Sequence, residues 1–206
     1  RATVFDHFCG GVNETDCLSV VDKMFTKGVS SVLDYSVEGK EEEAQFDAAL
    51  TMTLKTIEFA KERQAIPFAV FKPTGLGRFD LYEKVGAKET LTSAEQDEWN
   101  RVVDRFDLVC KTAHYKDVAL LIDAEESWMQ DAADDLVAQM MQKYNKEKAI
   151  VFNTLQMYRW DRLDYLKQLH EKAKQEGFFI GMKLVRGAYM EKENARAEDN
   201  GYPTPI

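Results

Sequence analysis

Five short apolar runs alternate with longer amphipathic stretches along this chain, and that alternation limits the fold more than any other feature. The runs are almost continuously hydrophobic, as expected of strands that are covered on both faces. The stretches between them repeat their apolar residues at helical spacing. Strands that alternate with helices predict an α/β fold with a parallel sheet. The predicted strands are residues 29–35, 66–72, 118–124, 149–155 and 178–185, and the predicted helices are residues 17–27, 41–63, 95–113, 127–144 and 159–175.

Two α/β architectures compete for this pattern. An open, doubly wound sheet that binds a nucleotide usually carries a glycine-rich first turn, and the nearest match, Gly75-Leu76-Gly77, lacks the third glycine. A barrel instead places polar residues at successive strand ends, where all of them face one mouth. Such residues occur at or near the end of each predicted strand, namely Asp34, Lys72, Asp123, Asn153 and Lys183. The sequence therefore favours a (β/α)8 barrel of the TIM type.

The length of the chain accounts for only part of such a barrel. Eight βα units take about 250 residues, whereas this chain has 206 residues and five recognisable units. We expect residues 1–28 to form a helical lead-in and residues 29–206 to form the first five βα units of an incomplete barrel. Roughly three further units would then lie outside this chain.

Charge and composition exclude several classes of function. A net charge of -9 and a pI of about 5.0 argue against nucleic acid as a partner, because phosphate binding needs a basic surface. No run of eighteen apolar residues is present to span a membrane. The cysteines, Cys9, Cys17 and Cys110, show no metal-ligand spacing, so we expect free thiols and no metal site.

Lys72 and Asp123 follow neighbouring predicted strands, so an ion pair between them is within reach. Each charge stabilises the ionised form of the other, and such a pair anchors a polar ligand more readily than it transfers protons. A purely structural ion pair at the barrel rim is an equally good interpretation.

A second group of chemically notable residues follows the last predicted strand, in the stretch GMKLVRGAYMEKE. Lys183 and Arg186 are suited to an electron-rich group, and Gly187 and Ala188 let a flat cofactor approach the backbone. Tyr189 is suited to forming an aromatic wall beside a ring. The alternative is a charged helix start with a buried tyrosine.

Five stretches taken together resemble the proline dehydrogenase family, and in particular its monofunctional eukaryotic-type and related bacterial branch. Each stretch alone is modest, but their order, each at a strand end, is highly specific. The resemblance covers nearly the whole chain. The stretches are VLDYSVEGKEEE, FAVFKPTGLGRF, LLIDAEESWMQDAADDL, IVFNTLQMY and MKLVRGAYMEKE.

The resemblance implies a flavoenzyme with a distorted (β/α)8 barrel that binds FAD without a covalent bond. Such an enzyme oxidises L-proline to Δ1-pyrroline-5-carboxylate, with a hydride passing from the ring carbon beside the nitrogen to flavin N5. Electrons then pass to a membrane quinone. The implied location is peripheral, at the cytoplasmic inner face of a bacterial membrane, with the matrix side of the mitochondrial inner membrane as the alternative.

The resemblance also implies roles for individual residues. Lys183 matches the cation near flavin N5, and Asn153 matches an amide at the isoalloxazine edge. Lys72 and Asp123 match the pair beside the substrate, with Lys72, Asp123 and Lys183 as the catalytic set. The segment around the flavin and its phosphates is matched by Val185, Arg186, Gly187 and Ala188, and the proline pocket by Leu184 and Tyr189.

The chain departs from the family pattern after Tyr189. No Arg-Arg…Glu helix follows to hold the substrate carboxylate and amine, so we expect the native protein to be longer. Two rival interpretations stay open. One is a barrel lyase or aldolase that uses Lys72 or Lys183 as a Schiff-base nucleophile, although Asp123 beside Lys72 disfavours the neutral amine. The other is a non-catalytic segment that works only with a complementary chain.

Overall fold

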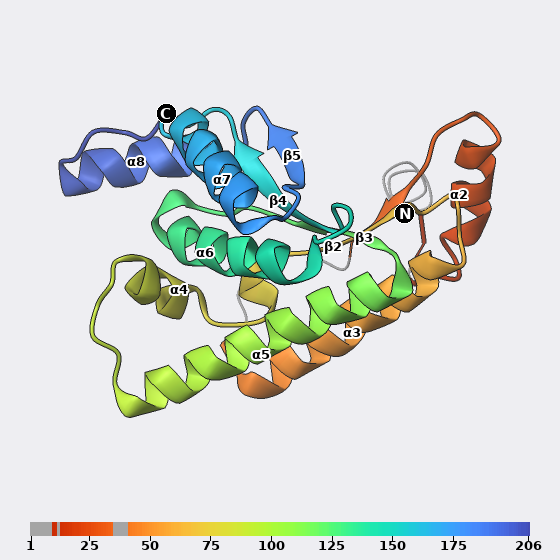
Figure 1. The fold of residues 1–206 in the computed structure, drawn as a ribbon, viewed down its shortest axis with the longest axis horizontal. Coiled ribbons are helices and arrows are strands. Elements are labelled where there is room, and N and C mark those ends of the chain that lie inside the picture. Colours follow the sequence, from red (N-terminus) through yellow and green to blue (C-terminus); the bar gives the residue numbers. More distant parts are fainter. Residues whose placement is uncertain (1–9, 12, 35–40) are drawn as a thin grey trace, which may run out of the picture.

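The computed structural model describes residues 10–11, 13–34 and 41–206, and the elements within them confirm an α/β fold (Figure 1). All neighbouring strands are parallel, and their order in the sheet equals their order in the sequence. An open doubly wound sheet reverses its strand order at one point, whereas a barrel wall does not. The strands are β1 (Val32–Leu33), β2 (Phe68–Phe71), β3 (Ala119–Ile122), β4 (Val151–Gln156) and β5 (Met182–Val185).

Long helices connect the strands and cover one face of the sheet (Figure 1). Helices α3 and α5 lie along each other, and α6 packs against both α5 and β4. The predicted helix 127–144 is confirmed at both ends. The helical elements are α2 (Leu18–Phe25), α3 (Glu43–Lys61), the 3-10 turn η1 (Pro73–Gly75), α4 (Phe79–Gly86), α5 (Ser93–Lys116), α6 (Ser127–Tyr144), α7 (Arg162–Glu176) and α8 (Met190–Asn200).

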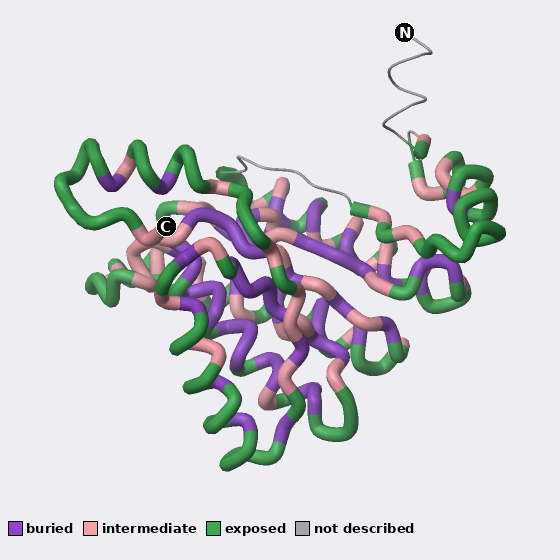
Figure 2. The backbone as a smooth tube through the Cα atoms, turned by 90° about the horizontal axis from the view of Figure 1, so that it is seen from above, coloured by how far each residue is buried: buried purple, intermediate pink, exposed green. Residues whose placement is uncertain are grey.

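The hydrophobic core lies between the sheet and these helices (Figure 2). Phe71 of β2 packs edge-on against Phe106 of α5, with ring centroids 5.2 Å apart, and Leu120 and Ile122 of β3 are buried on the same side. Because side chains alternate along a strand, their sequence neighbours point to the opposite face. That opposite face leads to the candidate site.

The observed strands are shorter than predicted. The predicted strand 29–35 ends at Leu33 within the described residues, and residue 35 lies outside them. The first four residues of the predicted strand 178–185 precede β5, and the first of them, Phe178, still completes the end of α7. Gly177 ends that helix with a φ of 66°, and Phe178 donates its N–H back to the carbonyl of Ala173.

Candidate functional site

One row of side chains crosses four strands at the carboxyl end of the sheet. Thr154 of β4 pairs with Lys183 of β5, and continuing the register through β3 and β2 adds Asp123 and Lys72 to the row. Neighbours in register on a parallel sheet point to the same face. The fold therefore brings together three of the predicted site residues, on the face opposite the covering helices.

Asp123 occupies the centre of this charged group. Its Oδ1 accepts a hydrogen bond from Lys183 Nζ, and its Oδ2 lies 4.0 Å from Lys72 Nζ. All three side chains are partly exposed, at 17% for Lys72, 20% for Asp123 and 31% for Lys183. A bound molecule can thus reach both ammonium groups, while one carboxylate offsets part of their charge.

The local sequence explains why Lys72 stands at a strand end. Pro73 follows it directly and opens the turn η1, and proline has no N–H to continue the sheet ladder. On the neighbouring strand, the N–H of Asp123 donates to the carbonyl of Phe71 at 3.0 Å. This bond fixes the two strand ends side by side.

The segment after β5 is open to solvent. Arg186, Gly187 and Ala188 are exposed, and Val185, half-buried, lies on the same face as Lys183. Tyr189 precedes α8 as its N-cap residue. The ammonium group of Lys192 lies 5.6 Å from the centroid of the Tyr189 ring, which is half-buried. The alternative prediction of a helix start at this residue is therefore confirmed, with a half-buried tyrosine.

Helix α8 is fixed by its contacts with α6 and α4. Both carboxylate oxygens of Glu193, which is fully buried, accept hydrogen bonds of 2.6 Å from Ser127, one from the backbone N–H and one from the hydroxyl. A carboxylate at a helix N-terminus is favoured by the free N–H groups there. Arg196 pairs with Glu83 of α4 and lies over the ring of Trp128. These contacts hold the end of the exposed segment.

Leu184 does not join the charged row. It alternates with Lys183 along β5, so it points to the helix-covered face, where it is 65% exposed. The structure thus separates Leu184 from the pair formed by Lys72 and Asp123.

The strand-end position predicted for Asn153 is wrong, because β4 continues to Gln156 and Asn153 is its third residue. Its amide nitrogen donates to Asp134 Oδ1 at 2.8 Å and lies 3.2 Å from the hydroxyl of Tyr165. It is 1% exposed and faces α6 and α7. Asn153 therefore lies on the opposite side of the sheet from Lys72, Asp123 and Lys183.

The partner of Asn153 is a buried carboxylate in a dense polar network. Asp134 also accepts hydrogen bonds of 2.8 Å from Gln130 and from Arg162. Burial raises the pKa of Asp134, and the hydrogen bonds and the nearby arginines oppose that shift. This network connects α6, α7 and β4, and its polar groups satisfy one another.

A further acidic residue, Glu125, was not assigned a role by the sequence analysis. It is 4% exposed, and its carboxylate accepts hydrogen bonds from the backbone N–H of Thr74 at 3.0 Å and from the Thr74 hydroxyl at 2.7 Å. Burial raises the pKa of Glu125. Its position directly after a buried strand, two residues beyond Asp123, is the sequence signal that could have identified it.

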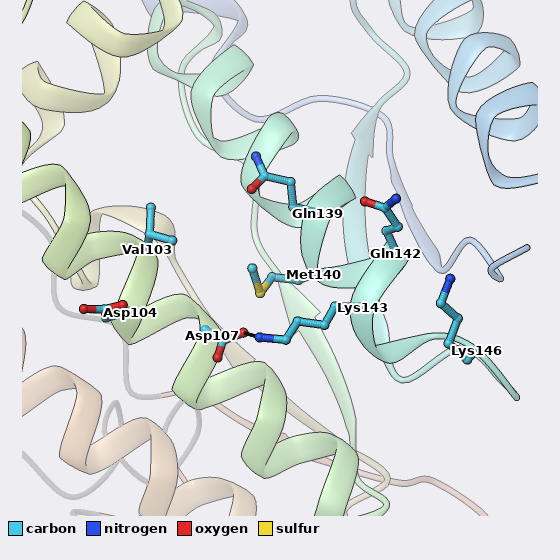
Figure 3. A pocket seen from close by; sticks show the side chains of 8 residues that line it. All are labelled: Val103, Asp104, Asp107, Gln139, Met140, Gln142, Lys143 and Lys146. Atoms are coloured by element: carbon cyan, nitrogen blue, oxygen red, sulfur yellow. Dashed lines mark hydrogen bonds and ion pairs between the residues drawn. The ribbon is translucent and has the colours of Figure 1, made fainter. Parts of the chain in front are cut away.

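A separate surface pocket of about 610 Å³ lies between α5 and α6 (Figure 3). Asp107 and Lys143, which line it, form an ion pair of 2.5 Å. None of the predicted site residues lines this pocket.

Within residues 10–11, 13–34 and 41–206, no cluster of three His, Cys, Asp or Glu side chains is arranged to hold a metal ion. Cys110 is a free thiol buried in the core, and Cys9 lies outside the described residues.

Comparison with protein families gives a match over most of the chain. The family model described as proline dehydrogenase matches residues 17–206. A carbapenem antibiotics biosynthesis protein, CarD, of Pectobacterium carotovorum subsp. carotovorum is 37% identical over 186 residues, which are 90% of this chain and 50% of CarD. Human mitochondrial proline dehydrogenase 1 is 41% identical over 115 residues, 56% of this chain and 19% of the human protein. The chain thus spans half or less of these two relatives.

A solved structure supports the fold assignment. Proline utilization A (PutA) from Bdellovibrio bacteriovorus, inactivated by N-propargylglycine, superposes with a TM-score of 0.78 at 17% sequence identity. The match covers 93% of this chain and 21% of that chain. The five-stranded parallel sheet is therefore an arc of the barrel fold that the sequence predicted.

Proposed function

We propose that this chain, which belongs to the proline dehydrogenase family, carries part of an active site that oxidises L-proline to Δ1-pyrroline-5-carboxylate with FAD. The observation that carries the proposal is the row in which Asp123 lies between Lys72 and Lys183 at the carboxyl end of a barrel-type sheet. In barrel enzymes that end of the sheet is where active sites lie.

The residues near this row fit a flavin in their charge and accessibility. Lys183 and Arg186 supply cations for an electron-rich ring and for phosphates, and Arg186 is exposed. Gly187 is exposed and has no side chain, so a ligand can approach its backbone. The fit does not extend to Asn153, whose amide is engaged on the other face of the sheet.

Bound FAD would supply the acceptor for the hydride that leaves the proline ring carbon beside the nitrogen. Lys183 would hold a positive charge beside that acceptor, which favours the electron-rich reduced ring. Lys72 and Asp123 would fix the polar groups of proline, and Tyr189 would limit the pocket beside them. The substrate nitrogen loses a proton as the ring carbon loses its hydride.

We further propose a membrane quinone as the final electron acceptor, reached from a peripheral position on a membrane. In the part of the chain that the structure describes, no helix has the length and apolar character to cross a bilayer. The human relative is named as mitochondrial, which supports the matrix side of the inner membrane, and the bacterial origin of CarD supports the inner face of a bacterial membrane.

The test is the visible flavin spectrum of the protein with FAD, before and after anaerobic addition of L-proline. We expect the absorbance to bleach, and we expect Lys183→Met to slow the bleaching by about 10²-fold or more. Lys143→Met is the matched control, because Lys143 lies on the helical surface and pairs with Asp107. A flavin that L-proline leaves oxidised, or a Lys183→Met protein as fast as the control, would contradict the proposal.

The same preparation tests the Schiff-base alternative. Trapping a carbonyl substrate on Lys72 or Lys183 with borohydride would favour the lyase or aldolase class. We expect no such adduct, because the Asp123 carboxylate engages both lysine side chains.

A further inference from the structure

The loops after β2 and β3 are joined by one buried contact, between Thr74 and Glu125. Thr74 lies two residues beyond Lys72, and Glu125 lies two residues beyond Asp123. Thr74 donates to one oxygen of Glu125 with its N–H, at 3.0 Å, and to the other oxygen with its hydroxyl, at 2.7 Å. Both residues are buried.

The two loops are also held from their other sides. The backbone N–H of Glu125 donates to the side chain of Gln130 at 2.9 Å, and its carbonyl accepts from the side chain of Gln156 at 2.6 Å. The carbonyl of Pro73 accepts from the hydroxyl of Tyr82 at 2.9 Å. The Glu125–Thr74 contact is therefore a direct side-chain link between two loops that are each anchored to the body of the protein, and it adds to the backbone bond between the two strand ends.

A buried carboxylate is a costly way to join two loops. Removing an ionised group from water is unfavourable, and a well-packed apolar pair of similar volume is often at least as stable. What the carboxylate adds is geometry, since each of its oxygens accepts one bond from a defined direction. Both oxygens are occupied by Thr74, which leaves Glu125 poorly placed to exchange a proton with a substrate.

We infer that Glu125 and Thr74 are positioning residues that set the spacing between Lys72 and Asp123. The inference rests on the proposed function in one respect, namely that this spacing serves the binding of L-proline. Neither residue would touch the substrate or the cofactor. They act through the two strand ends, whose charged groups lie 4.0 Å apart.

The test compares matched substitutions in the full protein with FAD. Thr74→Val removes the hydroxyl and keeps the side-chain shape, and Thr74→Ser keeps the hydroxyl. Thr53→Val is the control, because Thr53 is a buried threonine of α3 whose hydroxyl donates to the carbonyl of Ala49 within the same helix. Glu125→Gln is a second variant that removes the charge from the other side of the contact.

Two measurements are made on each variant. The first is the split between KM and kcat for L-proline. We expect Thr74→Val to raise KM by about tenfold with a smaller change in kcat, and we expect Thr74→Ser to restore most of the loss.

The second measurement is acylation of lysines by a succinimidyl ester, followed by peptide mass spectrometry. We expect Lys72 to be labelled faster in Thr74→Val and in Glu125→Gln than in the unsubstituted protein. Labelling of Lys143 in the same sample is the internal reference.

The second measurement needs no turnover, so the two proposals fail separately. An unsubstituted protein that does not oxidise L-proline would contradict the proposed function, and the labelling would still decide the positioning role. Labelling of Lys72 in Thr74→Val and Glu125→Gln that equals the labelling in Thr53→Val would overturn the inference. A KM that rises equally in Thr53→Val and Thr74→Val would do the same.

Discussion

At the scale of single residues, Asp123 and Asn153 show how the face of the sheet decides the role of a polar side chain. Asp123 ends its strand on the open face and lies between two lysines. Asn153, one strand further along the sheet, points to the covered face and is surrounded by protein groups. The first can meet a ligand, and the second stabilises the interior.

This contrast predicts the effect of Asn153→Leu, which has a similar volume and no donor. Asp134 would keep Gln130 and Arg162 but lose one hydrogen bond in a buried setting. We expect the free energy of unfolding to fall by about 1–3 kcal/mol, measured by urea denaturation. Flavin binding by the folded variant should be unchanged. A variant of normal stability that no longer binds FAD would instead support the cofactor role that the sequence suggested.

At the scale of elements, the connection between α4 and α5 depends on Glu95. Its carboxylate accepts hydrogen bonds from the N–H and hydroxyl of Thr92, which caps α5, and pairs with Lys84 of α4. The hydrogen bond from Lys84, together with those from Thr92, lowers the pKa of Glu95 from its ordinary value of 4.5 to about 2. One side chain thus links a helix start to the preceding helix.

The lowered pKa predicts how stability depends on pH. The folded protein holds the ionised form of Glu95 more strongly than the unfolded chain does, so the stabilisation is present above pH 4.5 and is lost as the pH falls through about 2. We expect Glu95→Gln to lower the melting temperature at neutral pH and to match the unsubstituted protein near the acid limit. A difference in melting temperature that stays constant across this range would refute the assignment.

The elements also show what the sequence could predict. Continuous apolar runs and helical periodicity identified all five strands and the helices α2, α3, α5, α6 and α7, because those patterns reflect burial directly. The short helix α4 was missed, and the short helix α8 was predicted only as an alternative, a charged helix start. They are eight and eleven residues long, and their stability depends on contacts such as Arg196 with Glu83, which periodicity does not contain.

The sequence predicted which strand-end residues lie together, but not which face of the sheet every candidate residue occupies. Lys72, Asp123 and Lys183 were grouped correctly because the carboxyl ends of parallel strands meet at one edge. Leu184 alternates with Lys183, so the two side chains lie on opposite faces wherever the strand ends. The face of Asn153 depends on the register between strands, and a shift of one residue reverses it. The Glu125–Thr74 contact joins residues 51 positions apart, beyond the reach of local patterns.

At the scale of the whole molecule, one face of the sheet packs against α3, α5 and α6 (Figure 1). The other face carries the charged row. Within the described residues, β2, β3 and β4 have a partner strand on each side, whereas β1 and β5 have one. The backbone of the central strands is therefore the more fully paired part of the sheet.

This arrangement predicts the order of amide hydrogen exchange in a protein of these 206 residues. We expect the amides of β3 to exchange at least about tenfold more slowly than those of β5, because local opening exposes edge strands first. The measurement is exchange followed by mass spectrometry of peptides covering residues 119–122 and 182–185. Equal protection of the two strands would mean that another segment pairs with the outer side of β5.

The single row across four strands also makes the protein unequally tolerant of insertions and deletions. One extra residue inside β3 before Asp123 would turn the Asp123 carboxylate toward the helix-covered face, away from Lys72 and Lys183. The same insertion in the solvent-exposed loop between α4 and α5 would leave the row untouched, since each strand keeps its own register. Loops that do not contact the row, such as the one between α4 and α5, should therefore be exchangeable between relatives, and the strands only when their lengths match to the residue.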